Sequence, residues 1–190
     1  MTDTYTVGYL IGSLSSTSIN RRLSTALVRL APANLNLVEI PIRDLPLYSQ
    51  DFDDDYPPQA RALKQAIDSV DAILIISPEY NRSIPGALKN AVDWASRPWG
   101  ENSFARKPTA IIGASVGAIG TAVVQQQLRS MLAFLDAPQM NTPEAYIQMK
   151  DGLIDDDGNV TVESTREFLA GFMTSFADFI ERVHVAIAHG

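Results

Sequence analysis

Hydrophobic residues fall along this chain in blocks that alternate between strand-like and helix-like periods. A nearly continuous apolar run at residues 6–11 stops at Gly12, which is typical of a strand buried on both faces. Ser18 can then cap a helix whose apolar face, at spacings of four, four and three, is Ile19, Leu23, Leu27 and Leu30. The first part of the chain therefore predicts a buried strand followed by an amphipathic helix.

The same alternation continues to the end of the chain. Further strands are expected at residues 35–40, 72–76, 109–112 and, as a short strand, near 137–141. Helices are expected at residues 59–68, 86–96 and 120–135, and one face of a long final helix is marked from Phe168 to Val183. Five strands alternating with five helices predict an α/β protein, a doubly wound five-stranded parallel sheet with helices on both faces. We find no linker or internal repeat, so residues 1–190 are expected to form a single domain.

Composition and charge exclude several functional classes. The 190 residues carry 15 Lys and Arg against 22 Asp and Glu, a net charge of −7 without a local basic patch, so nucleic acid is not an expected partner. The absence of Cys excludes disulfides and thiol nucleophiles, and two His are too few for an expected metal site. No secretory signal is visible at the N-terminus, so the cytoplasm is the expected location. Residues 109–128 are uncharged but contain three glycines, which favours a strand, a loop and a helix over a membrane span.

In doubly wound sheets, ligands bind outside the carboxyl ends of the strands, so the loops after the first, third and fourth strands are the candidate site. The first of these, residues 12–20, holds five hydroxyl side chains before a helix N-terminus. Free N–H groups, the helix dipole and hydroxyl donors favour a phosphate monoester there. No Gly-Lys-Ser/Thr follows, so this is not the loop of an ATP-hydrolysing enzyme. The structural alternative is a Ser-rich turn with a helix cap.

The second loop, residues 78–86, places Tyr80 and amide-rich backbone between Pro78 and Pro85. A stiff loop with an aromatic side chain suits a flat heterocycle that needs stacking and hydrogen bonds at its edge. The structural alternative is that Tyr80 is an ordinary packing residue and Glu79 is an exposed carboxylate.

The third loop carries an alternative function. Residues 113–117 satisfy Gly-x-Ser-x-Gly, the nucleophile elbow of serine esterases with the α/β-hydrolase fold. Ser115 is followed by Asp136 or Asp155 and then His184 or His189, the order of that catalytic triad. Against it, the next helix is expected to begin only near Gly120, no His-Gly-Gly-Gly oxyanion loop occurs, and both His lie at or beyond the end of the final helix.

Two of these loops together resemble a known family. Gly-Ser-Leu-x-x-x-Ser-x-Asn at residues 12–20 and Pro-Glu-Tyr-Asn-x-Ser-x-Pro-Gly-x-Leu-Lys-Asn-Ala-x-Asp-Trp at residues 78–94 are similar to motifs of the NAD(P)H-dependent FMN reductases, a family that includes chromate and quinone reductases. The elements fit from about Val7 to Val183. The resemblance implies a flavodoxin-like fold, bound FMN, NADPH or NADH as electron donor, and a homodimer or homotetramer. Trp94 and Trp99 can serve that interface or simply pack.

The resemblance also implies roles for individual residues. FMN would be bound by Ser13, Ser18, Ile19 and Asn20 at its phosphate, by Pro78, Glu79, Tyr80 and Asn81 at the flavin edge with Ser83 nearby, and by Ser115 and Gly117 as a third contact. Flavin N5 would carry the chemistry, so no catalytic side chain is expected. Family members often have Arg directly after Gly-Ser-Leu, where this chain has Ser15. A charge-assisted phosphate contact would then require Arg21 or Arg22 to reach back.

The resulting hypothesis is a two-electron reductase that passes hydride to quinones or similar small acceptors in a ping-pong mechanism. FMN, azo dyes and chromate are further acceptors within the group, although the net charge of −7 disfavours anionic chromate as the main substrate. The alternatives are the esterase based on Ser115 and a non-catalytic flavodoxin-like electron carrier.

Overall fold

Five parallel strands form the centre of the computed structural model, which describes residues 4–188. The strands are β1 (Tyr5–Ile11), β2 (Leu35–Glu39), β3 (Ala72–Ile76), β4 (Thr109–Ser115) and β5 (Tyr146–Gln148). The helices are α1 (Ile19–Leu30), α2 (Pro58–Asp68), α3 (Gly86–Ala95), α4 (Ala122–Phe134) and α5 (Glu163–Ala188), with a short 3-10 helix, η1, at Gln50–Phe52. The predicted order of elements is confirmed.

The strands lie in the order β2-β1-β3-β4-β5, and every pairing is parallel. This is the strand order of flavodoxin-like sheets, so the predicted fold class is confirmed. The chain passes from β1 outward to β2 and then returns to β3 on the other side of β1. The carboxyl ends of β1 and β3 therefore flank the switch point where this fold binds its ligands.

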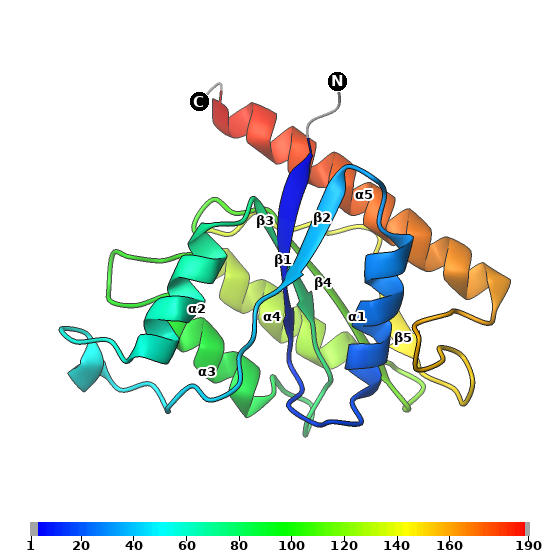
Figure 1. Ribbon diagram of the computed structural model, residues 1–190, viewed down its shortest axis with the longest axis horizontal. Coiled ribbons are helices and arrows are strands. Elements are labelled where there is room, and N and C mark those ends of the chain that lie inside the picture. The colour runs from blue at the N-terminus through cyan, green and yellow to red at the C-terminus, as the bar shows by residue number, and fades with distance from the viewer. Residues whose placement is uncertain (1–3, 189–190) are drawn as a thin grey trace.

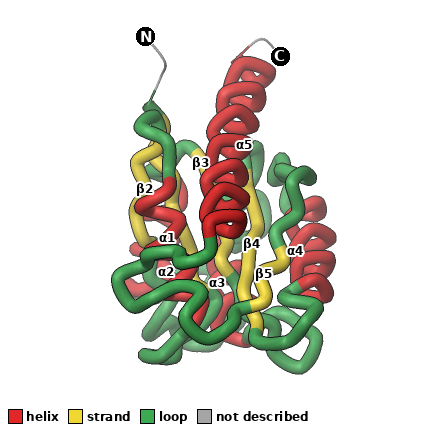
Figure 2. The backbone as a smooth tube through the Cα atoms, turned by 90° about the vertical axis from the view of Figure 1, so that its right-hand side faces the viewer, coloured by secondary structure: helices red, strands yellow, loops and turns green. Residues whose placement is uncertain are grey.

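Helices cover both faces of the sheet (Figure 1). One core cluster joins the sheet to α1 and α5, through side chains such as Leu27 and Phe172, and the other joins it to α2, α3 and α4. All five residues of β3 are buried as a result, which explains its unbroken apolar sequence. Figures 1 and 2 show that β1 begins and α5 ends at one edge of the sheet. The loops after β1 and β3 lie at the opposite edge, lowest in Figure 1.

The predicted position of the fifth strand was wrong. Residues 137–141 make only an isolated bridge, between Thr109 and Gln139, whereas β5 pairs with residues 113–115 at the end of β4. The residues on either side of Gln139 are hydrogen-bonded to the first residue of β4. Thr109 N–H donates to Pro138 O, and Met140 N–H donates to Thr109 O. Pro143 then interrupts strand pairing along this edge of the sheet, because proline has no N–H group to donate to the neighbouring strand. The regular strand, β5, begins only after Pro143.

The two tryptophans have different environments. Trp94 is fully buried, and its indole Nε1–H donates to Pro46 O at 2.7 Å, so it packs rather than serving a surface. Trp99 is 77% exposed. Residues 109–128 divide between β4, a loop and α4. Among the described helices, none combines the length and the apolar character that crossing a bilayer requires.

Candidate functional site

The loop between β1 and α1 is organised by its own hydroxyl groups. Ser15 N–H donates to Ser13 Oγ at 3.3 Å, and Thr17 N–H donates to Ser15 Oγ at 3.2 Å. Ser18 occupies the cap position of α1, but its side chain makes no capping bond. Among the described residues, its buried Oγ has no hydrogen-bond partner. A buried hydroxyl without a partner beside free helix N–H groups fits a phosphate oxygen, so the loop suits an anion such as a phosphate group.

Ile19 and Asn20 form the first turn of α1, where main-chain N–H groups have no partner within the helix. The Asn20 side chain points elsewhere. It is 1% exposed, its Nδ2 donates to Ala114 O at 2.9 Å, and its Oδ1 accepts from Ala114 N–H at 2.9 Å. The amide thus holds α1 against β4. The N–H groups of Ile19 and Asn20 are the donors that these residues present to an anion.

The loop after β3 contains a tight turn at residues 80–83. Asn81 and Arg82 have φ of 53° and 59°, and Tyr80 and Ser83 exchange main-chain hydrogen bonds of 3.2 and 2.9 Å. Two central residues of positive φ define the type I′ hairpin turn. Gln127 of α4 fixes it, because Ser83 Oγ donates to Gln127 Oε1 at 2.8 Å and Gln127 Nε2 donates to Arg82 O at 2.7 Å. Sequence reasoning missed Gln127, although three consecutive Gln in an uncharged segment were a visible signal.

Glu79 joins the second loop to the third. Its side chain is only 6% exposed, which contradicts its interpretation as an exposed carboxylate. Oε2 accepts from the N–H groups of Val123 and Val124 at 3.1 Å each, and Oε1 pairs with Arg82 at 3.0 Å. The carboxylate therefore caps α4, a favourable place for negative charge. Its main chain remains available to a flat ligand.

Close packing explains the first glycine of the Gly-x-Ser-x-Gly motif. A Cβ added to Gly113 would lie 2.1 Å from Ser77 O, so no side chain fits where β4 passes the end of β3. Ser115 is the last residue of β4, and its Oγ accepts from Gly117 N–H at 3.2 Å. The helix begins only at residue 122, and a nucleophile elbow requires it directly after the serine.

The histidine of the esterase alternative lies at the other edge of the sheet. His184 stacks on Tyr5 with ring centroids 5.3 Å apart, and its Nε2 is 3.2 Å from Asp71 O, beside the amino ends of β1 and β3. Ser115 ends β4 at the carboxyl edge. His189 lies outside the described residues. The geometry excludes a catalytic pair of Ser115 and His184.

The three loops meet at the carboxyl edge. Ser13 Oγ and Tyr80 Oη are 3.3 Å apart, which joins the first loop to the second, and Gly12 packs close to Pro78. The loops also present exposed apolar side chains, namely Tyr80, Val116 and Ile119. Polar main chain with an apolar rim suits a flat aromatic group that is held at its edge and stacked on its face.

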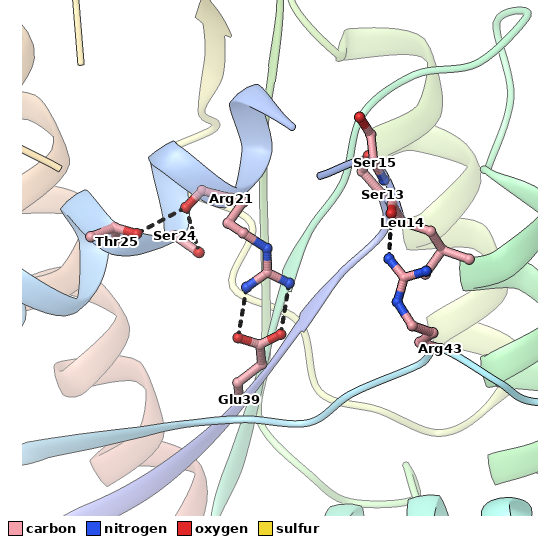
Figure 3. Close-up of polar contacts among 8 residues, drawn as sticks. All are labelled: Ser13, Leu14, Ser15, Arg21, Ser24, Thr25, Glu39 and Arg43. Atoms are coloured by element: carbon pink, nitrogen blue, oxygen red, sulfur yellow. Dashed lines mark hydrogen bonds and ion pairs between the residues drawn. The ribbon is translucent and has the colours of Figure 1, made fainter. Parts of the chain in front are cut away.

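Positive charge near the first loop comes from an unexpected direction (Figure 3). Arg21, one of the residues expected to reach back, forms a two-bond ion pair with Glu39 at 2.9 Å. The hydrogen bonds from Arg21 lower the pKa of the Glu39 carboxyl. Arg22 Nη1 lies 3.4 Å from Ile154 O. Arg43, which sequence reasoning missed, donates to Leu14 O in the loop itself.

Within residues 4–188, no cluster of three or more His, Cys, Asp or Glu side chains is arranged to hold a metal ion.

Comparison with known proteins agrees with this geometry. The sequence pattern of the NADPH-dependent FMN reductases matches residues 5–152. A 2-hydroxy-1,4-benzoquinone reductase from Burkholderia sp is 51% identical over 174 residues, which cover 92% of this chain and 95% of the relative. The solved structure of the flavoenzyme NAD(P)H:(acceptor) oxidoreductase FerB from Paracoccus denitrificans is 45% identical with a TM-score of 0.90, over 94% of this chain and 98% of that one.

A more distant structure supports the fold alone. The flavodoxin-related WrbA-like protein from Agrobacterium tumefaciens is 19% identical with a TM-score of 0.55, over 99% of this chain and 100% of that one. The family pattern covers most of the chain, and the fold agrees with it. The chain therefore belongs to the NADPH-dependent FMN reductase family and is a flavin-dependent oxidoreductase of flavodoxin-like fold that takes electrons from NAD(P)H.

Proposed function

We propose that this chain is an FMN-dependent NAD(P)H:quinone reductase in which residues 1–190 form one FMN-binding domain. The observation that carries the proposal is the buried, unpartnered Oγ of Ser18 at the N-terminus of α1, on the switch-point edge of the sheet. A phosphate monoester would complete its hydrogen bonding and meet the positive end of the helix. The family's cofactor, FMN, carries such a group.

The residues of the three loops would divide the work of binding. The hydroxyls of Ser13 and Ser18 and the N–H groups of Ile19 and Asn20 would hold the phosphate. The main chain of residues 78–81 and the Ser115–Gly117 segment would meet the edge of the flavin ring, with Ser83 beside it. When bound, FMN supplies a two-electron carrier that accepts hydride from NAD(P)H and gives it to an acceptor. Main-chain N–H groups near Asn81 and Gly117 would stabilise the negative charge of the reduced ring.

Glu79 is not available for acid–base chemistry, because both of its carboxylate oxygens are already bonded. The proposed chemistry needs no such side chain. Donor and acceptor would use the same exposed face in turn, beside Tyr80, which predicts ping-pong kinetics.

Quinones fit this face best because they are flat, apolar and uncharged, and the Burkholderia relative is named for a benzoquinone. Azo dyes and free FMN are expected to be slower acceptors, and the net charge of −7 disfavours chromate. Because NAD(P)H is regenerated in the cytoplasm, the proposal also expects the enzyme there.

We also propose that a second copy of the chain covers the surface around Trp99. Trp99 and Phe134 are 77% and 72% exposed, and their ring centroids lie 6.5 Å apart. They line a hollow of about 530 Å³ with Val92 and Met131, between α3 and α4. Paired exposed aromatic rings are typical of an interface. Light scattering should give a dimer or tetramer that dissociates in the Trp99→Ser variant, and a wild-type monomer would contradict this proposal.

The test of function is spectroscopic and kinetic. Purified protein should retain flavin bands near ~370 and ~450 nm that NAD(P)H bleaches anaerobically and a quinone restores. Initial rates at several fixed quinone concentrations should give parallel double-reciprocal lines. Failure to retain FMN would refute the proposal, and converging lines would refute the ping-pong mechanism. Bleaching without quinone turnover would indicate an electron carrier instead, and hydrolysis of a p-nitrophenyl ester that is lost in Ser115→Ala would indicate the esterase.

A further inference from the structure

The β1–α1 loop has no charged side chain of its own. Residues 12–18 are Gly, Leu, Thr and four Ser. Arg21 is committed to Glu39 by two hydrogen bonds of 2.9 Å, so its charge is already balanced. A phosphate ester carries up to two negative charges, and hydroxyl donors do not neutralise them.

Arg43 brings a positive charge to this loop from the segment after β2. Its Nη2 donates to the main-chain oxygen of Leu14, directly before the position where family members often have arginine (Figure 3). Within the described residues, the Arg43 guanidinium forms no ion pair with a carboxylate. Its charge is therefore free to act on an anion at the loop, unlike that of Arg21.

The Arg43 bond also orients a peptide group. The C=O of Leu14 and the N–H of Ser15 belong to one planar trans peptide and point in opposite directions. Holding the oxygen toward Arg43 turns the Ser15 N–H inward, where it donates to Ser13 Oγ at 3.3 Å. Ser13 Oγ in turn lies 3.3 Å from Tyr80 Oη. One chain of contacts thus runs from Arg43 through the loop to the turn at residues 80–83.

This side of the loop borders a hollow. Behind Ser13 and Leu14 lies a cavity of about 560 Å³, also lined by Arg21, Glu39 and Arg43. Leu14 itself is 39% exposed. A peptide that borders a cavity is held by its hydrogen bonds rather than by packing, so the Arg43 contact sets its orientation.

We infer that Arg43 is the positioning residue of the phosphate site: it fixes the Leu14–Ser15 peptide and supplies the positive charge that Ser15 does not. This inference rests on the proposed function, since it takes the anion to be the phosphate of FMN. Arg43 acts through the loop and is not required to contact the phosphate directly. Its effect should therefore depend on the phosphate and not on the flavin ring.

Riboflavin, which is FMN without the phosphate, separates these contributions. Flavin fluorescence quenching gives the Kd of apoprotein for FMN and for riboflavin in wild type, Arg43→Gln and Arg43→Lys. Arg182→Gln is a matched control, because Arg182 is also exposed and also donates to a main-chain oxygen, Asp178 O at 3.3 Å, but near the end of α5 at the opposite edge of the sheet. Urea unfolding of each apoprotein verifies that it is folded.

Arg43→Gln should weaken FMN binding about tenfold and change riboflavin binding less than twofold. Arg43→Lys should recover part of the FMN affinity, because it retains the charge, and Arg182→Gln should match wild type. Added NaCl should weaken FMN binding to wild type more steeply than to Arg43→Gln. Equal losses for both flavins, or no loss for either, would overturn the inference. If wild type binds neither flavin, the proposed function fails as well, so the two failures are distinguishable.

Discussion

Replacing Asn20 by alanine tests whether this residue is a structural strap or a phosphate ligand. Ser115 O accepts from Met149 N–H at 2.8 Å on the β5 side of β4. Because successive main-chain groups alternate in direction along a strand, those of Ala114 face the other way, beyond the end of β3 at Ile76. The Asn20 amide fills this place and pairs with both groups of Ala114, as a further strand would.

The magnitude follows from burial. Ala114 is 0% exposed, so Asn20→Ala leaves one N–H and one C=O without partners and away from water. Each unpaired buried group costs about 1–3 kcal/mol. We therefore expect a loss of about 3 kcal/mol in the free energy of unfolding, a large part of the 5–15 kcal/mol that is typical of a domain.

Asn90 provides a matched control. Its side chain makes the same two kinds of bond, accepting from Tyr48 N–H and donating to Pro46 O at 2.9 Å each, but at a half-buried position where water can replace it. Asn90→Ala should cost only about 1 kcal/mol. Urea unfolding of both apoproteins measures the difference. Equal midpoints for the two variants would refute the reasoning, and a stable Asn20→Ala variant with weak FMN binding would restore its side chain as a phosphate ligand.

Three further predictions concern the same edge of the sheet. Ser18→Ala should weaken FMN binding about tenfold in a fluorescence titration. The stability of the apoprotein should not change, because the Ser18 hydroxyl makes no hydrogen bond within the described residues. An unchanged Kd would show that Ser18 does not bind the phosphate. Hydrogen bonds from Arg21 lower the pKa of the Glu39 carboxyl in the folded protein. The Arg21–Glu39 pair therefore stabilises the fold fully above the ordinary Glu pKa, and this stabilisation is lost as the pH falls through the lowered pKa of Glu39. Urea unfolding between about pH 6 and pH 3 should therefore show wild type converging on Glu39→Gln at the acidic end, and a constant difference would contradict this. Gly113→Ala should lower the free energy of unfolding by about 3 kcal/mol, because the added Cβ would meet main chain. Gly117→Ala should lower it far less, because the nearest atom to its Cβ would be 3.6 Å away. Equal urea midpoints for the two variants would mean that close packing is not the reason for Gly113.

Local periodicity predicted the parts of the fold that depend on one segment at a time. The unbroken apolar run at residues 72–76 is β3, and the spacing from Ile19 to Leu30 gives the bounds of α1. The fifth strand was misplaced because residues 137–141 have strand-like composition and do touch β4, but only by an isolated bridge. An edge strand of three residues after Pro143 gives too short a pattern to detect.

The sequence located the site better than it identified the work of individual side chains. Loops at the carboxyl edge follow from strand order, so their positions could be predicted from the alternation of elements alone. The partners of Asn20 and Glu79 lie 94 and about 44 residues away, and no local pattern encodes them. Arg43 was missed for the same reason, because its partner Leu14 lies 29 residues earlier.

These long-range contacts have a consequence for binding. Asn20 replaces a missing strand, Glu79 caps α4, and Gln127 fixes the turn at residues 80–83, all through contacts within the chain. Loops that are held by such contacts lose less conformational entropy when a ligand binds, so more of the interaction energy remains as affinity. Affinity should therefore depend chiefly on the groups left unsatisfied, the Ser18 hydroxyl and the N–H groups at the start of α1. Tyr80 is held by its hydroxyl, 3.3 Å from Ser13 Oγ, but its side chain is still 49% exposed. The exposed apolar surface that it provides together with Val116 and Ile119 can therefore accept donors and acceptors of different shapes in turn.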